Sequence, residues 1–154
     1  FIFRTLAIGV ADNGDFYRAL AGNGLYYLED EPYSFVHTQF GITGAAVIKE
    51  IYITTHSLLI QSAIFINKLF YSHTYFDIRF LALIYAVILL VSVYFAVKAF
   101  SNHSIWFRWI LAVLIVLIMG DVGYLAYFNS FYGEALTYVT LILAVSMFLY
   151  TIQK

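Results

Sequence analysis

The chain reads Leu81-Ala82-Leu83-Ile84-Tyr85-Ala86-Val87-Ile88-Leu89-Leu90 in the middle of an almost unbroken apolar run from Phe76 to Ala99. A run of this length is sufficient for a helix to cross the hydrocarbon core of a bilayer, which takes about 20 residues. Two further apolar runs follow, at about residues 105–127 and 135–152. We therefore predict three complete transmembrane helices.

The composition excludes an ordinary soluble domain. Hydrophobic residues make up 63% of the chain and charged residues only 11%, whereas a soluble domain carries roughly a quarter charged residues. Aromatic residues, at 20%, suit a protein with much surface at membrane–water interfaces. The net charge of −1 gives no support for a nucleic-acid partner. Membrane lipid is the expected partner.

The chain reads as a single transmembrane unit, residues 1–154, of the all-α polytopic class. Residues 1–11 are apolar but too few to span, so we interpret them as the end of a first helix in a fragment of a longer protein. Residues 12–75 are interpreted as an extracytoplasmic loop that carries a surface helix, and residues 76–154 as the three spans. Because the chain contains no cysteine, disulfides and thiolate metal sites are excluded.

Two helical segments are predicted inside the loop. Residues 15–20 could form a short helical turn with Phe16 and Leu20 on one side. Residues 50–70 form a longer apolar stretch that is interrupted by Gln61, Asn67 and Lys68. A Lys near the centre of a spanning helix costs roughly 2.5–3.5 kcal/mol, so a helix that lies on the membrane surface is favoured over a spanning one.

The basic residues near the span ends predict the orientation, because Lys and Arg are retained on the cytoplasmic side. Lys98 and Arg108 flank one short loop, and Lys154 ends the chain two spans later on the same face. The long acidic loop and the connection at Glu134 then lie on the extracytoplasmic side. Arg79 would sit at the outer interface, either snorkelling or paired with Asp77.

Carboxylates are the candidate functional groups. Asp12 and Asp15 would share one face of a helical turn, with Arg18 three residues further on. They serve either as a helix cap with an acidic first turn or as a general base where a membrane helix exits. Asp121 is expected inside an apolar helix, where a carboxylate is expensive and indicates function, unless it reaches the interface or bonds Tyr124.

Glu134, in the short connection before the last span, is the third candidate, and by itself it would only favour a helix start. The four histidines are scattered, with no pair at metal-ligand spacing, and are interpreted as solvated side chains. They are His37, His56, His73 and His103.

The order of these elements resembles the first part of a C-type glycosyltransferase, the polytopic superfold that moves sugars from polyprenyl-phosphate carriers. The matching strings are Asp12-Asn13-Gly14-Asp15, Asn67-Lys68-Leu69-Phe70, Asp77-Ile78-Arg79-Phe80-Leu81 and Phe128-Asn129-Ser130-Phe131-Tyr132-Gly133-Glu134. The last string, with Asp121 before it, looks most like bacterial cell-surface glycan hexosyltransferases. The resemblance covers nearly the whole chain and implies a bacterial plasma-membrane location.

The resemblance implies sugar transfer from a polyprenyl-phosphate donor to an extracytoplasmic glycan acceptor. Asp12 or Asp15 would be the base, and Glu134 would position substrate or a metal, for which its oxygens suit Mg²⁺ or Mn²⁺. Implied substrate-binding residues are Arg18, Asp121, Asn129 and Tyr132. We expect Asp12 or Asp15 to share one outward-opening cleft with Glu134.

Two other classes of protein remain open. A transporter or channel subunit would use Asp121 and Glu134 to line an ion or proton path. An assembly subunit without a site would keep these acids apart and separately solvated.

Overall fold

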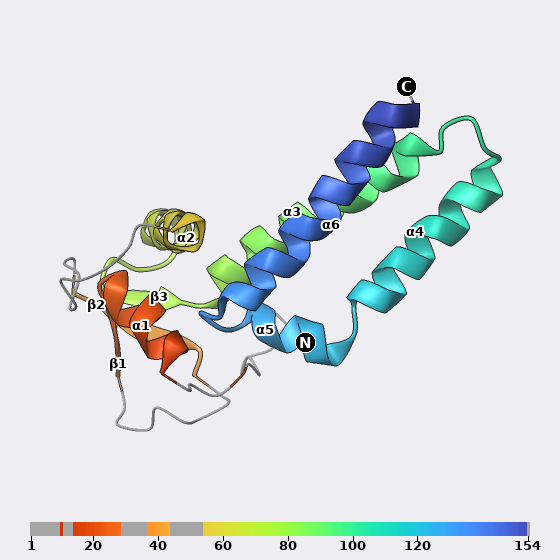
Figure 1. The fold of residues 1–154 in the computed structure, drawn as a ribbon. Helices are drawn as coiled ribbons and strands as arrows, with labels where there is room; N and C mark the ends of the chain where they lie inside the picture. Colours follow the sequence, from red (N-terminus) through yellow and green to blue (C-terminus); the bar gives the residue numbers. More distant parts are fainter. Residues whose placement is uncertain (1–9, 11–13, 29–36, 44–53, 154) are drawn as a thin grey trace.

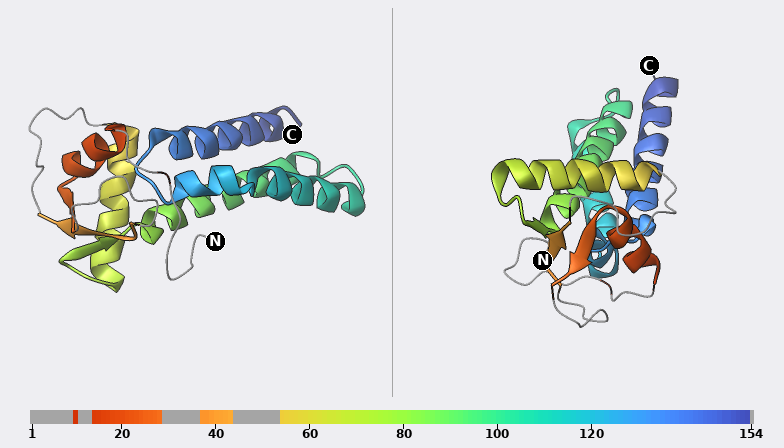
Figure 2. Two further views of the ribbon diagram at one scale, coloured as in Figure 1. Left: turned by 90° about the horizontal axis from the view of Figure 1, so that it is seen from below. Right: turned by 90° about the vertical axis from the view of Figure 1, so that its left-hand side faces the viewer.

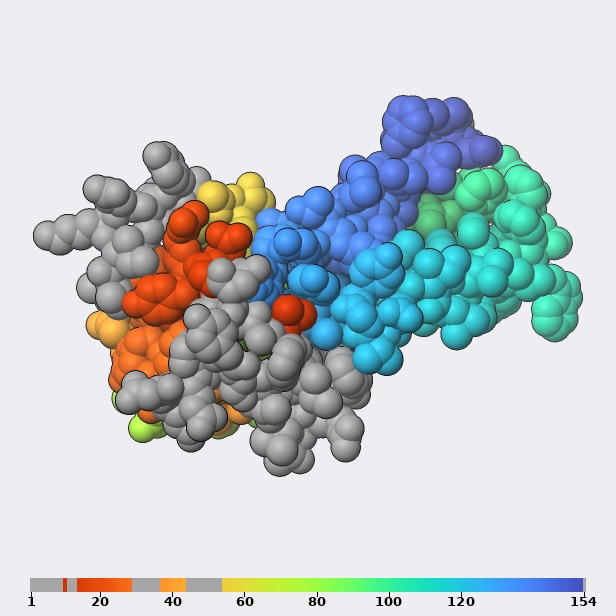
Figure 3. Space-filling view, turned by 60° about the horizontal axis from the view of Figure 1, so that its bottom comes forward, coloured from red at the N-terminus to blue at the C-terminus, as the bar shows by residue number. Residues whose placement is uncertain are grey.

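The structure of the chain is a computed structural model, and it describes residues 10, 14–28, 37–43 and 54–153. The described part is helical, with one small sheet, and has two regions (Figure 1). The arm consists of the long helices α3 (Arg79–Ala99), α4 (Ile105–Met119) and α6 (Gly133–Gln153). The head consists of α1 (Asp15–Gly22), α2 (Thr55–Phe70) and three short strands. Figure 3 shows α4 and α6 extending away from the head.

Helices α3 and α6 confirm two of the predicted spans. Each contains 21 residues, which at about 1.5 Å per residue gives a length close to the ~30 Å of a hydrocarbon core. The two helices run side by side (Figures 1 and 2). Several of the residues buried along them are small, as is typical where membrane helices approach closely; they include Ala82, Ser92, Ala96, Ala99, Ala135 and Ser146. The chain is therefore an integral membrane protein whose helices contact lipid.

The predicted span at about residues 105–127 is not one continuous helix. Helix α4 ends at Met119, α5 (Val122–Phe128) follows, and the two are bent by 71°. The prediction that Asp121 lies inside an apolar helix was wrong, because Asp121 caps α5 by accepting from the Gly123 N–H at 2.8 Å. The described chain thus has two helices able to span a membrane, or three if the bent pair counts as one.

Gly120 is the residue that permits the break. Its N–H donates to the Val116 carbonyl at 2.7 Å and closes the last turn of α4. A Cβ at this position would lie 2.6 Å from the same carbonyl oxygen. A larger residue would therefore have to change the local backbone.

The small sheet was not predicted from the sequence. Strands β1 (Leu25–Tyr27), β2 (Gln39–Ile42) and β3 (Tyr75–Asp77) pair antiparallel in that order. Tyr26 lies opposite Gly41, and a Cβ on Gly41 would lie 2.1 Å from the tyrosine ring. The glycine therefore leaves room for the ring to lie across the neighbouring strand.

Helix α1 confirms the predicted helical turn, with Phe16 and Leu20 both buried. It begins after Gly14, whose φ of 99° is in the left-handed region that favours glycine. Asp12, the expected capping residue, lies outside the described residues.

Helix α2 crosses the end of the arm instead of running along it (Figures 1 and 2). Thr54 caps the helix by accepting from the Ser57 N–H at 3.1 Å. Its inner face buries Ile60, Ala63 and Ile64, while Phe65 and Phe70 stay exposed. The helix lies across the ends of the spans with apolar side chains exposed, and its position at a membrane surface stays a prediction.

Asn67 and Asp77 join α2 to the sheet and to the start of α3. The buried Asn67 amide donates to the carbonyls of Ser72 and Tyr75, and its oxygen accepts from the Asp77 N–H at 2.9 Å. Asp77 in turn accepts from Arg79 Nε at 2.8 and 3.0 Å and pairs with the terminal guanidinium nitrogen. The predicted Asp77–Arg79 pair is therefore present.

We expect Asn67→Ala to lower the free energy of unfolding by about 2 kcal/mol, because it leaves two carbonyls and one N–H without their buried partner. Ser62→Ala on the same helix is the matched control, since the Ser62 hydroxyl only donates back to Leu58 at an exposed position. It should change stability by less than about 0.5 kcal/mol. The measurement is unfolding in mixed micelles followed by circular dichroism. Equal stability of the two variants would contradict this role of Asn67.

Candidate functional site

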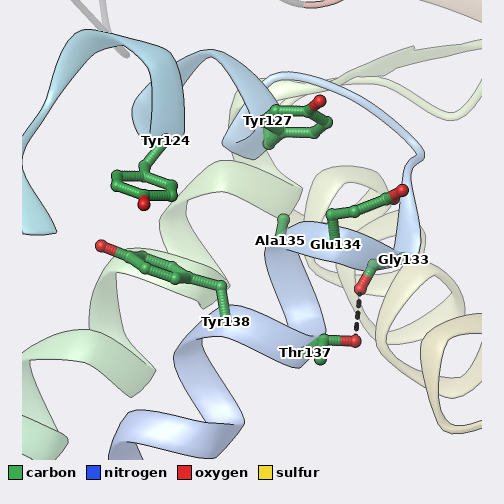
Figure 4. A pocket seen from close by; sticks show the side chains of 7 residues that line it. All are labelled: Tyr124, Tyr127, Gly133, Glu134, Ala135, Thr137 and Tyr138. Atoms are coloured by element: carbon green, nitrogen blue, oxygen red, sulfur yellow. Dashed lines mark hydrogen bonds between the residues drawn. The ribbon is translucent and has the colours of Figure 1, made fainter.

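A cavity of about 590 Å³ opens where α5 meets the start of α6. Helix α5 contributes Tyr124 and Tyr127, and the first turns of α6 contribute Glu134 and Tyr138 together with smaller residues. Figure 4 shows the rings of Tyr124 and Tyr138 facing each other and Glu134 near Tyr127. The cavity therefore combines one carboxylate with three tyrosines.

The connection between α5 and α6 positions Glu134. The Ser130 hydroxyl donates to the Tyr127 carbonyl at 2.7 Å and accepts from the Tyr132 N–H at 3.4 Å. Phe131 is buried against rings of the head, with centroid distances of 5.1 Å to Phe16 and 5.1 Å to Phe40. The connection is thus fixed to the head on one side and to α5 on the other.

Glu134 lies in the first turn of α6, where unpaired backbone N–H groups favour a negative charge. Thr137 donates to the Gly133 carbonyl at 3.1 Å and holds this turn. Among the residues that the structure describes, no donor bonds the Glu134 carboxylate. It is therefore available to accept hydrogen bonds from a ligand.

Tyr124, Tyr127 and Tyr138 form the tyrosine wall of the cavity. Tyr124 and Tyr138 stack with their centroids 4.6 Å apart and their planes at 12°. The Tyr138 hydroxyl donates to the Met119 carbonyl at 3.2 Å, at the break between α4 and α5. The end of α4 at the break therefore contacts Tyr138, a residue that lines the cavity.

His56 of α2 lies close to this site and was missed from the sequence, which treated all four histidines as solvated. It is half-buried, and its Nε2 lies 3.0 Å from the hydroxyl of Tyr85 on α3. Burial lowers the pKa of His56 below its ordinary value of 6.5, and the charge of Glu134 opposes this. Nothing in the sequence around His56 signals its contact, because Tyr85 is 29 residues away.

The other predicted site residues are dispersed. Asp15 and Arg18 form an exposed ion pair at 3.8 Å on α1, and Asp15 is not among the described residues that line the cavity. Asn129 and Tyr132 are buried in the connection, and Tyr132 contacts Phe16 at a centroid distance of 5.7 Å. Helix α1 therefore packs beside the Glu134 connection, while Asp12 lies outside the described residues.

No group of three or more His, Asp or Glu residues comes together to hold a metal ion within residues 14–28, 37–43 and 54–153. The sequence left open whether Asp and Glu side chains bind Mg²⁺ or Mn²⁺. Within the described site, Glu134 is the only carboxylate that lines the cavity.

A helical arm, a head laid across its end and an acidic, aromatic cavity between α5 and α6 characterise the described part of this integral membrane domain. The chain belongs to the family described as the YfdI N-terminal transmembrane domain, whose family model matches residues 1–154. No curated protein and no solved structure matches the chain.

Because burial in the folded protein lowers the pKa of His56, the unfolded chain binds a proton there more readily. We therefore expect the free energy of unfolding to fall as the pH drops below about 6.5, and His56→Gln to remove this part of the slope. His73→Gln, which alters an exposed histidine, is the control and should keep it. The measurement is unfolding in micelles between about pH 7.5 and 5.5. An unchanged slope in His56→Gln would contradict the assignment.

Proposed function

We propose that the chain is part of a membrane glycosyltransferase that transfers a sugar from a polyprenyl-phosphate carrier to an extracytoplasmic glycan acceptor. The observation that carries the proposal is the cavity that Glu134 lines together with Tyr124, Tyr127 and Tyr138. Tyrosine rings offer apolar faces to the C–H side of a sugar and hydroxyls to its edge. A carboxylate accepts hydrogen bonds from sugar hydroxyls.

The position of the cavity supports the same function. The donor is anchored in lipid by its polyprenyl chain, whereas the acceptor glycan arrives from water. The cavity lies where α5 meets the first turns of the apolar helix α6, so a ligand there would lie at the end of a proposed span and could reach both phases. A site buried in the arm or on the far side of the head would serve only one of the two.

The proposed reaction begins with removal of a proton from an acceptor hydroxyl by Asp12 or Asp15. The hydroxyl oxygen attacks the anomeric carbon of the donor sugar, and the bond from that carbon to the phosphate oxygen breaks. The products are the lengthened glycan and the polyprenyl phosphate, with the proton on the carboxylate. Glu134 orients the sugar through its hydroxyls.

The remaining predicted residues receive supporting roles in this proposal. Arg18, paired with Asp15 on the exposed side of α1, is available to a phosphate group. Asn129 and Tyr132 are buried in the connection and act by holding Glu134 in place. Asp121 caps α5 and so sets the position of Tyr124 and Tyr127.

One observation favours a transporter as the second candidate function. Helices broken within the membrane often form ion and substrate sites, and the break between α4 and α5 carries the carboxylate Asp121. In that function Asp121 and Glu134 would line a proton or cation path.

We expect Glu134→Gln to lower the rate of sugar transfer by at least about 100-fold, and Asp12→Asn or Asp15→Asn to abolish it, because these amides keep the shape but lose the charge. The measurement is transfer of labelled sugar from a polyprenyl-phosphate donor in membranes that contain equal amounts of each protein. Normal rates of sugar transfer in Asp12→Asn, Asp15→Asn and the double variant would contradict the assignment of either residue as the base.

Asp121→Asn separates the two candidate functions. Asparagine is as good a helix cap as aspartate, so α5 should remain intact while the charge is lost. Sugar transfer should continue in this variant. Loss of a proton-coupled flux on Asp121→Asn, with no sugar transfer in the parent protein, would favour the transporter.

A further inference from the structure

A second cavity lies at the other end of the arm, between α3 and α4, and the proposed function does not use it. Its volume is about 420 Å³. Lys98 and Tyr94 of α3 face Arg108 and Trp109 of α4 across it. The turn between α3 and α4 lies far from the head (Figure 1).

Among the described residues, neither cation of this cavity forms an ion pair with a carboxylate. Residues 78–120 contain no Asp or Glu. In the part of the chain that the structure describes, the two ion pairs join Arg18 to Asp15 and Arg79 to Asp77, both at the head. Within residues 14–28, 37–43 and 54–153, the positive charges of Lys98 and Arg108 are therefore not paired with an acidic side chain.

The cations are nevertheless held in place. The Lys98 ammonium donates to the Tyr94 hydroxyl at 3.0 Å and lies 5.3 Å from the centre of the Tyr150 ring on α6. Arg108 Nε is buried, and among the described residues it has no hydrogen-bond partner. A buried N–H of a charged group that has no acceptor is energetically costly. A ligand that supplies an acceptor atom here would remove this cost.

Phosphate is the group that best matches these donors. A guanidinium binds two phosphate oxygens in parallel, and an ammonium adds a compact positive charge. The exposed indoles of Trp106 and Trp109 mark the depth at which lipid headgroups lie. We propose that this cavity binds the phosphate of an anionic phospholipid, with Lys98 and Arg108 as its ligands and Trp109 beside its acyl chains.

A lipid fits this cavity better than a free phosphate ion does. The walls include the exposed apolar side chains of Ile105 and Trp109. An acyl chain would bury this apolar surface, whereas a hydrated ion would not. Basic pockets between membrane helices are a recurring way to hold an anionic headgroup. The site would fix the far end of α4, a helix that buries none of its own residues.

The two tryptophans of the chain make the proposal testable. In a Trp106→Phe protein, Trp109 is the only indole, and lipids with brominated acyl chains quench it on contact. We expect half-maximal quenching at a roughly fivefold lower membrane fraction of brominated phosphatidylglycerol than of brominated phosphatidylcholine. In Arg108→Gln and Lys98→Gln, the two lipids should reach half-maximal quenching at nearly the same membrane fraction. Lys68→Gln, which removes one cation at the head, should keep the preference for phosphatidylglycerol.

Arg108→Lys is the control for loss of fold. It retains the positive charge, so a folded protein with this change should keep a reduced preference for phosphatidylglycerol. Equal quenching by both lipids in the parent protein, or an unchanged preference in Arg108→Gln and Lys98→Gln, would overturn the proposal. Inorganic phosphate distinguishes the two sources of the ligand. If it abolishes the preference while chloride at equal ionic strength does not, the site binds the free ion and the lipid assignment is wrong.

Discussion

The burial of Phe131 between rings of the head is the interaction on which the rest of the structure depends. Phe131 follows α5 and precedes α6, so its contacts with Phe16, Phe40 and Phe76 tie the end of the arm to α1 and to two strands. Because aromatic pairs add to the free energy of burial, this cluster holds segments that are more than a hundred residues apart in sequence. It brings Glu134 to the boundary between the head and the arm.

The helices of the arm could be predicted from the sequence because lipid imposes a simple rule, that a long apolar run must satisfy its own backbone hydrogen bonds. The break at Gly120 could not be predicted, because apolar residues continue on both sides of it. In the sequence, Asp121 could equally be an acidic residue inside a continuous membrane helix. The strands of the head are three or four residues long, and pairing such as Tyr26 with Gly41 depends on segments distant in sequence. The candidate site was predicted in part: Glu134 was recognised as a carboxylate at a helix start, but the tyrosine wall and His56 are apparent only from tertiary contacts.

The charges of the protein are divided between its two ends. Acidic groups such as Glu134 and Asp15 belong to the side of the head, together with the paired cations Arg18 and Arg79. The far end of the arm holds Lys98 and Arg108 without acidic partners among the described residues. The predicted orientation, with Lys98 and Arg108 on the cytoplasmic face, was inferred from these same charges and stays a prediction.

The central claim is that the cavity at Glu134 receives the sugar of a lipid-linked donor, and photolabelling tests it most directly. A polyprenyl-phosphate sugar that carries a diazirine on the sugar ring would be irradiated with the protein in membranes, and the labelled peptides identified by mass spectrometry. The account predicts labels within residues 124–138, reduced by an excess of unmodified donor. Labels confined to the far end of the arm, or labels that an excess of donor does not reduce, would contradict it.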